Sequence, residues 1–156
     1  MELAQFITGS LAPAVAMSTA ALLATGLQAR YGDIVKRIRA LSDERRELGA
    51  KNALTAAEGE RHFSLQGQLT ILLSRARLMQ SAIMLIYLAI FCFLATSFAI
   101  AFIAEEPGVL TGDLPKYLFL GGMGSVAIGV FLEVLEMRLA FRIIKYEVGS
   151  ISPVQT

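Results

Sequence analysis

Hydrophobic residues gather in three long stretches, and the central one, residues 82–104, contains no charged side chain. It is long enough to cross a bilayer, because about 20 helical residues span the ~30 Å of hydrocarbon. An acidic pair and a Pro-Gly dipeptide follow the stretch, and Arg75 and Arg77 precede it. A helix of this length in a soluble protein carries a polar face, which this one lacks. The pattern predicts a transmembrane helix over residues 81–104.

The first apolar stretch, residues 3–29, is rich in alanine, serine and threonine. It begins without the Lys or Arg residues that open a secretory leader, so we expect a retained first transmembrane helix, with Pro13 in its first turns or at a kink. One face carries small and hydroxyl residues spaced by three and four, which let helices approach closely in lipid. Packing between helices is the main interpretation, and lining of an aqueous path is the alternative. The face consists of Ser10, Ala14, Ser18, Ala21 and Thr25.

The third stretch predicts a transmembrane helix over residues 117–140, after an outer loop over residues 105–116. Glycine, serine and glutamate share one of its faces at spacings of three and four, and such a face requires a close neighbour. The two glutamates lie near the end of the span, where a charge needs a partner. We expect them to pair with Arg75, Arg77 or Arg138, and a ring of acids along an ion path is the alternative. The face consists of Gly122, Ser125, Gly129, Glu133 and Glu136.

Between the first two spans, residues 30–80 show apolar residues at alternating spacings of four and three, with one break near residues 49–54. Gly49 can end a helix, and Thr55-Ala56-Ala57-Glu58 has the form of a capping box that starts another. Two heptad segments joined by a short turn predict an antiparallel coiled-coil hairpin. The pattern of the second arm runs through Met79 to Ile83 without a helix breaker, so we expect this arm to continue into the central span. Arg45 occupies one heptad position. The predicted seam consists of Ile34, Ile38, Leu41, Leu48, Leu65, Leu69 and Leu72.

Together these elements predict an all-α membrane protein that forms a single domain over residues 1–156. It has three transmembrane helices, a cytoplasmic hairpin between the first and second, and a cytoplasmic tail over residues 141–156. Only 17% of the residues are charged, and the mean hydropathy is +0.60. Ten of the fourteen Lys and Arg residues lie between Arg30 and Arg77. Because positive residues stay in the cytoplasm, we expect the N-terminus outside and the C-terminus inside.

The basic residues nearest the spans are expected to meet anionic lipid head groups, so membrane lipids are the first expected partner. Acidic residues are interspersed among them along the hairpin. This mixture favours a solvated, salt-bridged surface over a nucleic-acid interface. The membrane-boundary basic residues are Arg30, Arg37, Arg39, Arg75 and Arg77.

Sequence motifs for catalysis or for metal and cofactor binding are absent, since no CxxC, HExxH or phosphate-loop pattern occurs. The single cysteine, Cys92, lies inside the central span and is interpreted as a packing residue, because burial in lipid disfavours the thiolate. His62 falls on the predicted seam. A half-exposed residue near the hairpin tip is the main interpretation, and a metal or pH site is the alternative. We expect no enzymatic activity, no metal and no cofactor.

Three segments are similar to a family of small bacterial membrane proteins known only as a domain of unknown function, number twenty-seven twenty-one. The resemblance rests on Gly26–Arg30, Ile34–Leu41 and Leu72–Ala76, and it extends over about residues 5–147. It implies a location in a bacterial inner membrane. It brings no activity and no catalytic residues.

Two functional hypotheses follow from the arrangement of spans and hairpin. Three spans in one chain do not readily enclose a pore, so a channel requires several copies around an axis. The first hypothesis is therefore a homo-oligomer, channel-like and cation-conducting, because acids lie at both ends of the spans. The alternative is a membrane scaffold or accessory subunit whose hairpin docks a cytoplasmic protein. Both hypotheses use the same residues, and the sequence does not choose between them.

Overall fold

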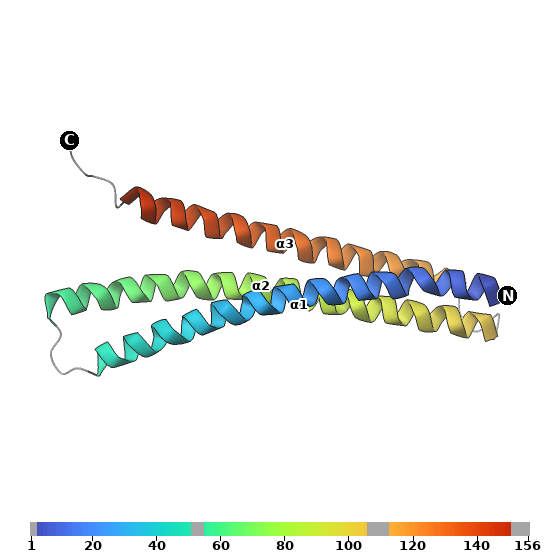
Figure 1. Cartoon of the computed structure of the whole chain (residues 1–156), viewed down its shortest axis with the longest axis horizontal. Coiled ribbons are helices and arrows are strands. Elements are labelled where there is room, and N and C mark those ends of the chain that lie inside the picture. The colour runs from blue at the N-terminus through green and yellow to red at the C-terminus, as the bar shows by residue number, and fades with distance from the viewer. Residues whose placement is uncertain (1–2, 51–54, 106–112, 151–156) are drawn as a thin grey trace. The chain divides into compact units, whose positions relative to one another are not determined.

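The computed structural model of the chain consists of three long helices (Figure 1). The structure describes residues 3–50, 55–105 and 113–150, and their side chains over residues 9–50, 55, 58–103 and 113–139. α1 spans Leu3–Gly49, α2 spans Ala56–Glu105 and α3 spans Leu114–Ser150. Each helix is long and apolar enough to cross a membrane. The chain is therefore an all-helical protein with three candidate spans, as a multi-pass membrane protein requires.

The helices contribute to two compact units. The first unit contains residues 1–28 and 81–132, and the second contains residues 29–80 and 133–156. Each helix passes from one unit into the other without a break. The expectation that the second arm of the hairpin continues into the central span is thus confirmed. α1 is also one helix, although its apolar stretch ends at Arg30.

The helix ends around the predicted turn follow local capping chemistry. α1 ends at Gly49, and the Ala50 N–H still donates to the Arg46 carbonyl at 3.0 Å. At the start of α2, the backbone N–H and the hydroxyl of Thr55 both donate to Glu58 Oε2, at 2.9 Å each. The bond from the Thr55 N–H satisfies a backbone donor that a helix start leaves unpaired, and it is the bond that the glutamate of a capping box accepts, so this half of the predicted capping box is confirmed. Residues 51–54 of the predicted turn lie outside the described residues.

The third helix is longer than the predicted span over residues 117–140. It begins at Leu114, because Pro115 fits the first turn, where its missing N–H needs no partner. The Tyr117 N–H donates to the Asp113 carbonyl at 3.2 Å, which closes that turn. The helix then continues to Ser150. Residues 106–112 of the predicted outer loop and 151–156 of the predicted tail lie outside the described residues.

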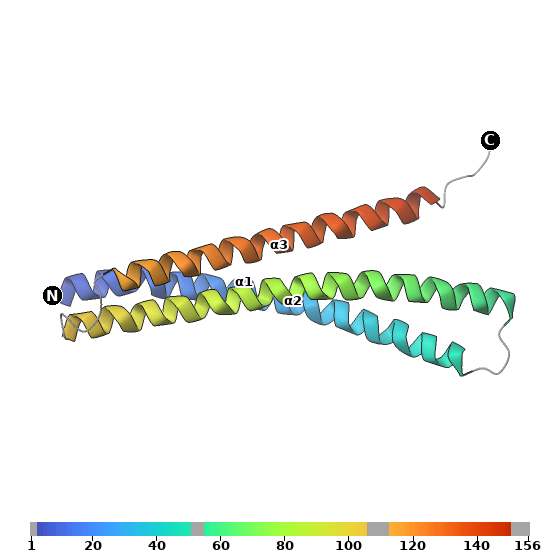
Figure 2. The same cartoon turned by 180° about the vertical axis from the view of Figure 1, so that it is seen from behind.

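In the first unit, segments of all three helices lie side by side, and Figure 2 shows the same arrangement from behind. The rings of Phe93 on α2 and Phe119 on α3 are in contact, tilted by 48° with centroids 5.5 Å apart. Gly122 and Gly129 of α3 are buried against α2, where their missing side chains leave room for Phe93 and Ile86. α1 joins this bundle through a hydrogen bond from Gln28 Nε2 to the Tyr87 hydroxyl.

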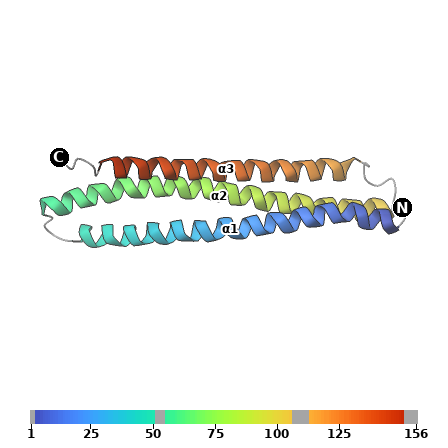
Figure 3. The same ribbon diagram turned by 45° about the horizontal axis from the view of Figure 1, so that its top comes forward.

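In the second unit, α2 lies between α1 and α3 (Figure 3). Apolar residues of α2 are buried at spacings of three and four, and the matching positions of α1 are half-buried. Near the predicted turn, Arg61 of α2 pairs with Glu44 of α1 at 2.9 Å. The residues on the α2 side are Leu65, Leu69, Leu72, Ala76 and Met79, and those on the α1 side are Ile34, Ile38, Leu41 and Leu48.

Replacing Gly122 with alanine tests the close packing of α3 on α2. A Cβ at this position would lie 2.6 Å from Phe93 Cε1. The Phe93 ring cannot easily move, because it is buried and packed against the Phe119 ring. We expect Gly122→Ala to lower the free energy of unfolding by about 1–3 kcal/mol, measured by denaturant titration of the purified chain in mixed micelles.

The neighbouring glycine provides the control. Gly121 is exposed, and a Cβ there has no atom within 4 Å. Gly121→Ala should therefore leave stability unchanged or raise it by up to about 1 kcal/mol, through helix propensity alone. Equal effects of the two substitutions would contradict the packing of Gly122 against Phe93.

Candidate functional site

The best-defined polar site consists of four charged residues, Arg30, Arg75, Glu133 and Glu136, which we call the charge layer. Arg30 comes from α1, Arg75 from α2, and both glutamates from α3, where a spacing of three residues puts them on one face. All four belong to the second unit, at the ends of the apolar stretches. The charge layer therefore joins all three helices.

The inner pair of the charge layer is Arg75 and Glu136. Arg75 Nε lies 2.7 Å from Glu136 Oε1, and the two side chains are 27% and 4% exposed. A carboxylate this deeply buried needs a charged partner, because an isolated charge is costly both in a protein interior and in a membrane. The short distance is typical of a charge-assisted hydrogen bond.

The outer pair is Arg30 and Glu133, whose Nη1 and Oε1 atoms lie 3.0 Å apart. Its side chains are 49% and 21% exposed, so water screens this pair more than the inner one. The sequence did not indicate Arg30 as a partner. The available signal was its position, since Arg30 closes the first apolar stretch and the glutamates lie near the end of the third.

The charge layer bears on the two interpretations of the glutamates. Both glutamates have an arginine partner within the chain, and Arg75 is one of the partners expected for them. Arg77 and Arg138 are exposed and do not supply these pairs. This geometry favours the packing interpretation over a ring of acids along an ion path. Chemically, the pairs neutralise the carboxylates and hold three helices together.

The remaining residues of the predicted α3 face belong to the first unit. Gly122 and Gly129 are buried against α2, while Ser125 is half-buried. A Cβ at Gly129 would lie 3.0 Å from Ile86 Cδ1 and 3.3 Å from the Ala82 carbonyl oxygen. This face therefore packs within the chain, as small-residue faces do in lipid.

The predicted small-residue face of α1 is arranged differently. Ser18 and Thr25 are exposed, as are the two alanines between Ser10 and Thr25 on this face. The hydroxyls of Ser18 and Thr25 donate to carbonyls four residues earlier in α1, at 3.0 Å each. Ser10 is half-buried. The buried face of α1 in the first unit is instead formed by Pro13, Ala20, Ala24 and Leu27.

A comparison with known protein families identifies the family of this chain. A family model described as "Protein of unknown function (DUF2721)" matches residues 10–146. The chain belongs to the DUF2721 family. The match includes the charge layer, the predicted hairpin, the second and third candidate spans and all but the first residue of the first candidate span. No curated protein and no solved structure matches the chain.

Beyond the charge layer, two predicted residues of this DUF2721 protein have defined surroundings. Cys92 is half-buried in α2, and its carbonyl accepts a hydrogen bond from the buried Thr96 hydroxyl at 2.8 Å. His62 is half-buried near the start of α2. Among the described residues, no group of three or more His, Cys, Asp or Glu side chains could hold a metal ion.

The other predicted basic residues of the DUF2721 chain lie on its surface. Arg37 and Arg39 of α1 and Arg77 of α2 are all exposed. They are positioned on the second unit, as the charge layer is. Exposure keeps Arg37 and Arg39 available to solvent or to lipid head groups.

A double-mutant cycle on Arg75 and Glu136 measures the inner pair. We expect Arg75→Gln to lower the free energy of unfolding by about 3–5 kcal/mol, because it leaves the Glu136 carboxylate buried without a partner. Glu136→Gln should cost less, since Arg75 is 27% exposed and can reach water. The double substitution should restore part of the loss.

A surface pair serves as the control in the same micelle titrations. Lys36 and Asp33 lie 3.3 Å apart with side chains 80% and 78% exposed. Lys36→Gln should change stability by no more than about 1 kcal/mol. Additive effects of Arg75→Gln and Glu136→Gln would show that the two residues do not act as a pair.

Proposed function

We propose that this protein is a membrane-anchored assembly module whose copies associate through the small-residue face of α1. The observation that carries the proposal is the exposure of Ser18, Thr25 and their alanine neighbours within a candidate span. In lipid, helices associate through small residues and hydroxyl groups rather than through hydrophobic burial. The same type of face on α3 has a partner within the chain, at Gly122 and Gly129. The α1 face lacks such a partner in the described structure, and a second copy of the chain would supply one.

Cysteine cross-linking at two adjacent positions tests this association. Ser18 and Thr19 are both exposed, and both hydroxyls donate to a carbonyl four residues earlier. They differ by about 100° around the helix, and only Ser18 lies on the small-residue face. With Cys92 replaced by alanine, we expect Ser18→Cys to give a disulfide-linked dimer on mild oxidation in native membranes.

Thr19→Cys is the matched control, since it lies at nearly the same depth and should cross-link far less. Strong and equal cross-linking at both positions would indicate random collision in the membrane. Failure of Ser18→Cys to cross-link would remove the small-residue face of α1 as the interface.

The second part of the proposal is that the polar segments of α1 and α2 form a cytoplasmic coiled-coil hairpin. Its support is the burial of leucines at spacings of three and four along α2 and the half-buried matching positions of α1. The excess of Lys and Arg between Arg30 and Arg77 supports the cytoplasmic side, with the N-terminus outside and the C-terminus inside. The exposed Arg37 and Arg39 are then available to anionic head groups of a bacterial inner membrane.

Docking of a cytoplasmic protein on the hairpin is the second candidate function, and Phe63 is the observation that favours it. This side chain is 81% exposed near the start of α2, outside the apolar stretch. Exposed aromatic residues are frequent anchors of protein interfaces. A scaffold or accessory subunit would use such an anchor to hold its partner beside the membrane.

Thiol labelling at Phe63 tests two proposals: that the hairpin lies on the cytoplasmic side of the membrane, and that a partner protein docks at Phe63. With Cys92 replaced by alanine, we expect a membrane-impermeant maleimide to label Phe63→Cys only after cells are permeabilised. Asp113→Cys, at an exposed position before α3, should be labelled in intact cells. The reverse pattern would invert the proposed topology.

The same variants report on a partner. Phe63→Cys should react more slowly in native membranes than in purified protein, because a docked partner would cover it. Ala40→Cys, at an exposed position of α1, provides the control and should react alike in both preparations. Equal reactivity of Phe63→Cys in both preparations would argue against docking at this residue.

Cation conduction by the assembled copies stays a prediction. The acidic residues that motivated it inside the third span, Glu133 and Glu136, are engaged by arginines of the same chain. A conducting path would have to be lined by other groups between copies, such as the hydroxyls of α1. The proposal of self-association does not depend on conduction.

A further inference from the structure

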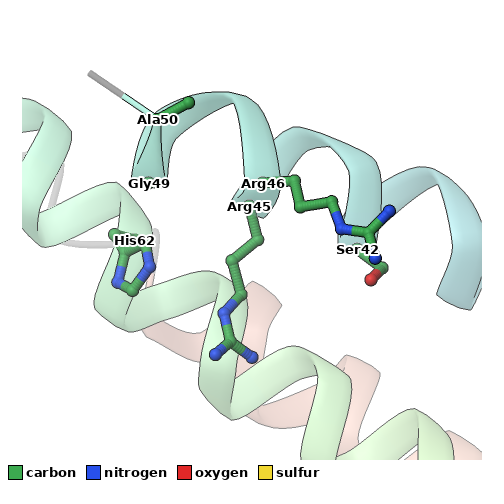
Figure 4. Close-up of a pocket in the computed structure, with 6 residues that line it drawn as sticks. All are labelled: Ser42, Arg45, Arg46, Gly49, Ala50 and His62. Carbon is green, nitrogen blue, oxygen red and sulfur yellow. The ribbon is translucent and has the colours of Figure 1, made fainter.

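A polar hollow lies between the last turns of α1 and the first turns of α2, within the second unit. Its volume is about 610 Å³. Figure 4 shows the Arg45 side chain directed toward α2, the Arg46 side chain directed along α1 toward Ser42, and His62 on the facing helix. The hollow is lined by Ser42, Arg45, Arg46, Gly49, Ala50 and His62.

The hollow exists because polar residues replace apolar ones at the end of the seam. On α1, Arg45 occupies the heptad position between Leu41 and Leu48. On α2, His62 lies three residues before the first buried leucine, Leu65, which is the spacing between neighbouring seam positions of a heptad. A guanidinium and an imidazole cannot pack as a dry seam, so they leave a space between the helices that water can enter.

The positive charge of the hollow is not neutralised by its neighbours. Within the described part of the chain, the side chains of Arg45 and Arg46 form no ion pair or hydrogen bond. Among the neighbouring carboxylates of α1, Glu44 is engaged by Arg61 at 2.9 Å, while Asp43 and Glu47 are exposed and do not line the hollow. The described lining of the hollow includes no acidic side chain. Arg45 and Arg46 therefore line the hollow with two guanidinium groups that have no ion-pair partner among the described residues.

The lining supplies hydrogen-bond donors of the kinds that bind phosphate oxygens. Guanidinium groups bind phosphate in a planar, two-pronged geometry, and the imidazole N–H and the Ser42 hydroxyl can add single bonds. Among the described residues of the lining, the His62 imidazole is the only ring on which a nucleobase could stack. The chemistry points to recognition of phosphate groups rather than of a base.

We propose that this hollow binds a soluble, phosphate-bearing small anion. Lipid phosphates are the other source of the same chemistry, and the length of α1 argues against them. Arg45 lies fifteen residues beyond Arg30 in one continuous helix, which corresponds to roughly 22 Å. This exceeds a Debye length of about 8 Å, so head groups at the level of Arg30 do not reach the hollow. The choice of a soluble ligand rests on the proposed topology, whereas the phosphate chemistry does not.

Isothermal titration of the full chain with inorganic pyrophosphate tests the proposal. The protein is placed in phosphatidylcholine nanodiscs in a phosphate-free buffer of about 0.15 M ionic strength. We expect saturable binding, which Arg45→Gln together with Arg46→Gln should weaken by about tenfold or more. The control combines Arg37→Gln with Arg39→Gln, which removes the same charge from exposed positions of α1 outside the hollow. This control should weaken binding by no more than about twofold.

Several results would overturn the assignment. Absence of saturable heat with the unmodified chain would remove the site, and equal weakening in both double variants would show diffuse attraction instead. Binding of short-chain phosphatidylglycerol without binding of pyrophosphate would show that the ligand is a lipid. Circular dichroism before titration verifies that each variant is folded. Cross-linking through Ser18→Cys is measured separately, so failure of this site and failure of self-association remain distinguishable.

Discussion

One helix, α2, must present a continuous packing stripe along both a polar and an apolar half, and the other two helices are arranged around it. Its buried residues recur at spacings of three and four from Leu65 to Ala99. In the polar half, burial of leucine drives packing, at about 25 cal/mol per Å² of apolar surface. In lipid the hydrophobic effect does not drive helices together, and van der Waals contact between closely packed helices stabilises their association instead. The stripe accordingly changes from leucines to alanines, Phe93 and Thr96, and the glycines of α3 pack against it.

The charge layer lies where this change in packing chemistry occurs along the sequence. Neither leucine burial nor glycine contact fixes how far one helix slides past another, because both repeat along the helix. An ion pair such as Arg75 with Glu136 is unique, and breaking it leaves a buried carboxylate without a partner. The pair therefore selects one register between α2 and α3. Arg30 and Glu133 add a weaker restraint between α1 and α3, since both side chains are more exposed.

The features that depend on local sequence were predictable, and those that depend on helix rotation were not. Spacing and capping residues predicted the continuation of α2 and its start after Thr55, because both are properties of one segment. The pairing of Glu136 with Arg75 was also within reach, since both lie at span ends. The tight contact at Gly122 rather than at Gly121 was not, because adjacent residues differ by about 100° around the helix and Phe93 decides between them. Likewise, the α1 pattern shows a face of small residues without showing whether its neighbour belongs to the same chain.

Arg45 is a seam residue whose charge is better explained by ligand binding than by stability. A leucine at this heptad position, half-buried like Leu41 and Leu48, would stabilise the packing of α1 on α2 by about 1 kcal/mol. The sequence lacks this stabilisation at Arg45, which lines the polar hollow together with Arg46 and His62. Were Arg45 needed only for solubility, a position on the outer face of α1 would serve equally well, as it does for Arg37 and Arg39. A guanidinium on the face of α1 that meets α2 can instead bind a ligand that enters between the two helices. Because a guanidinium only donates hydrogen bonds and is positively charged, that ligand is an anion.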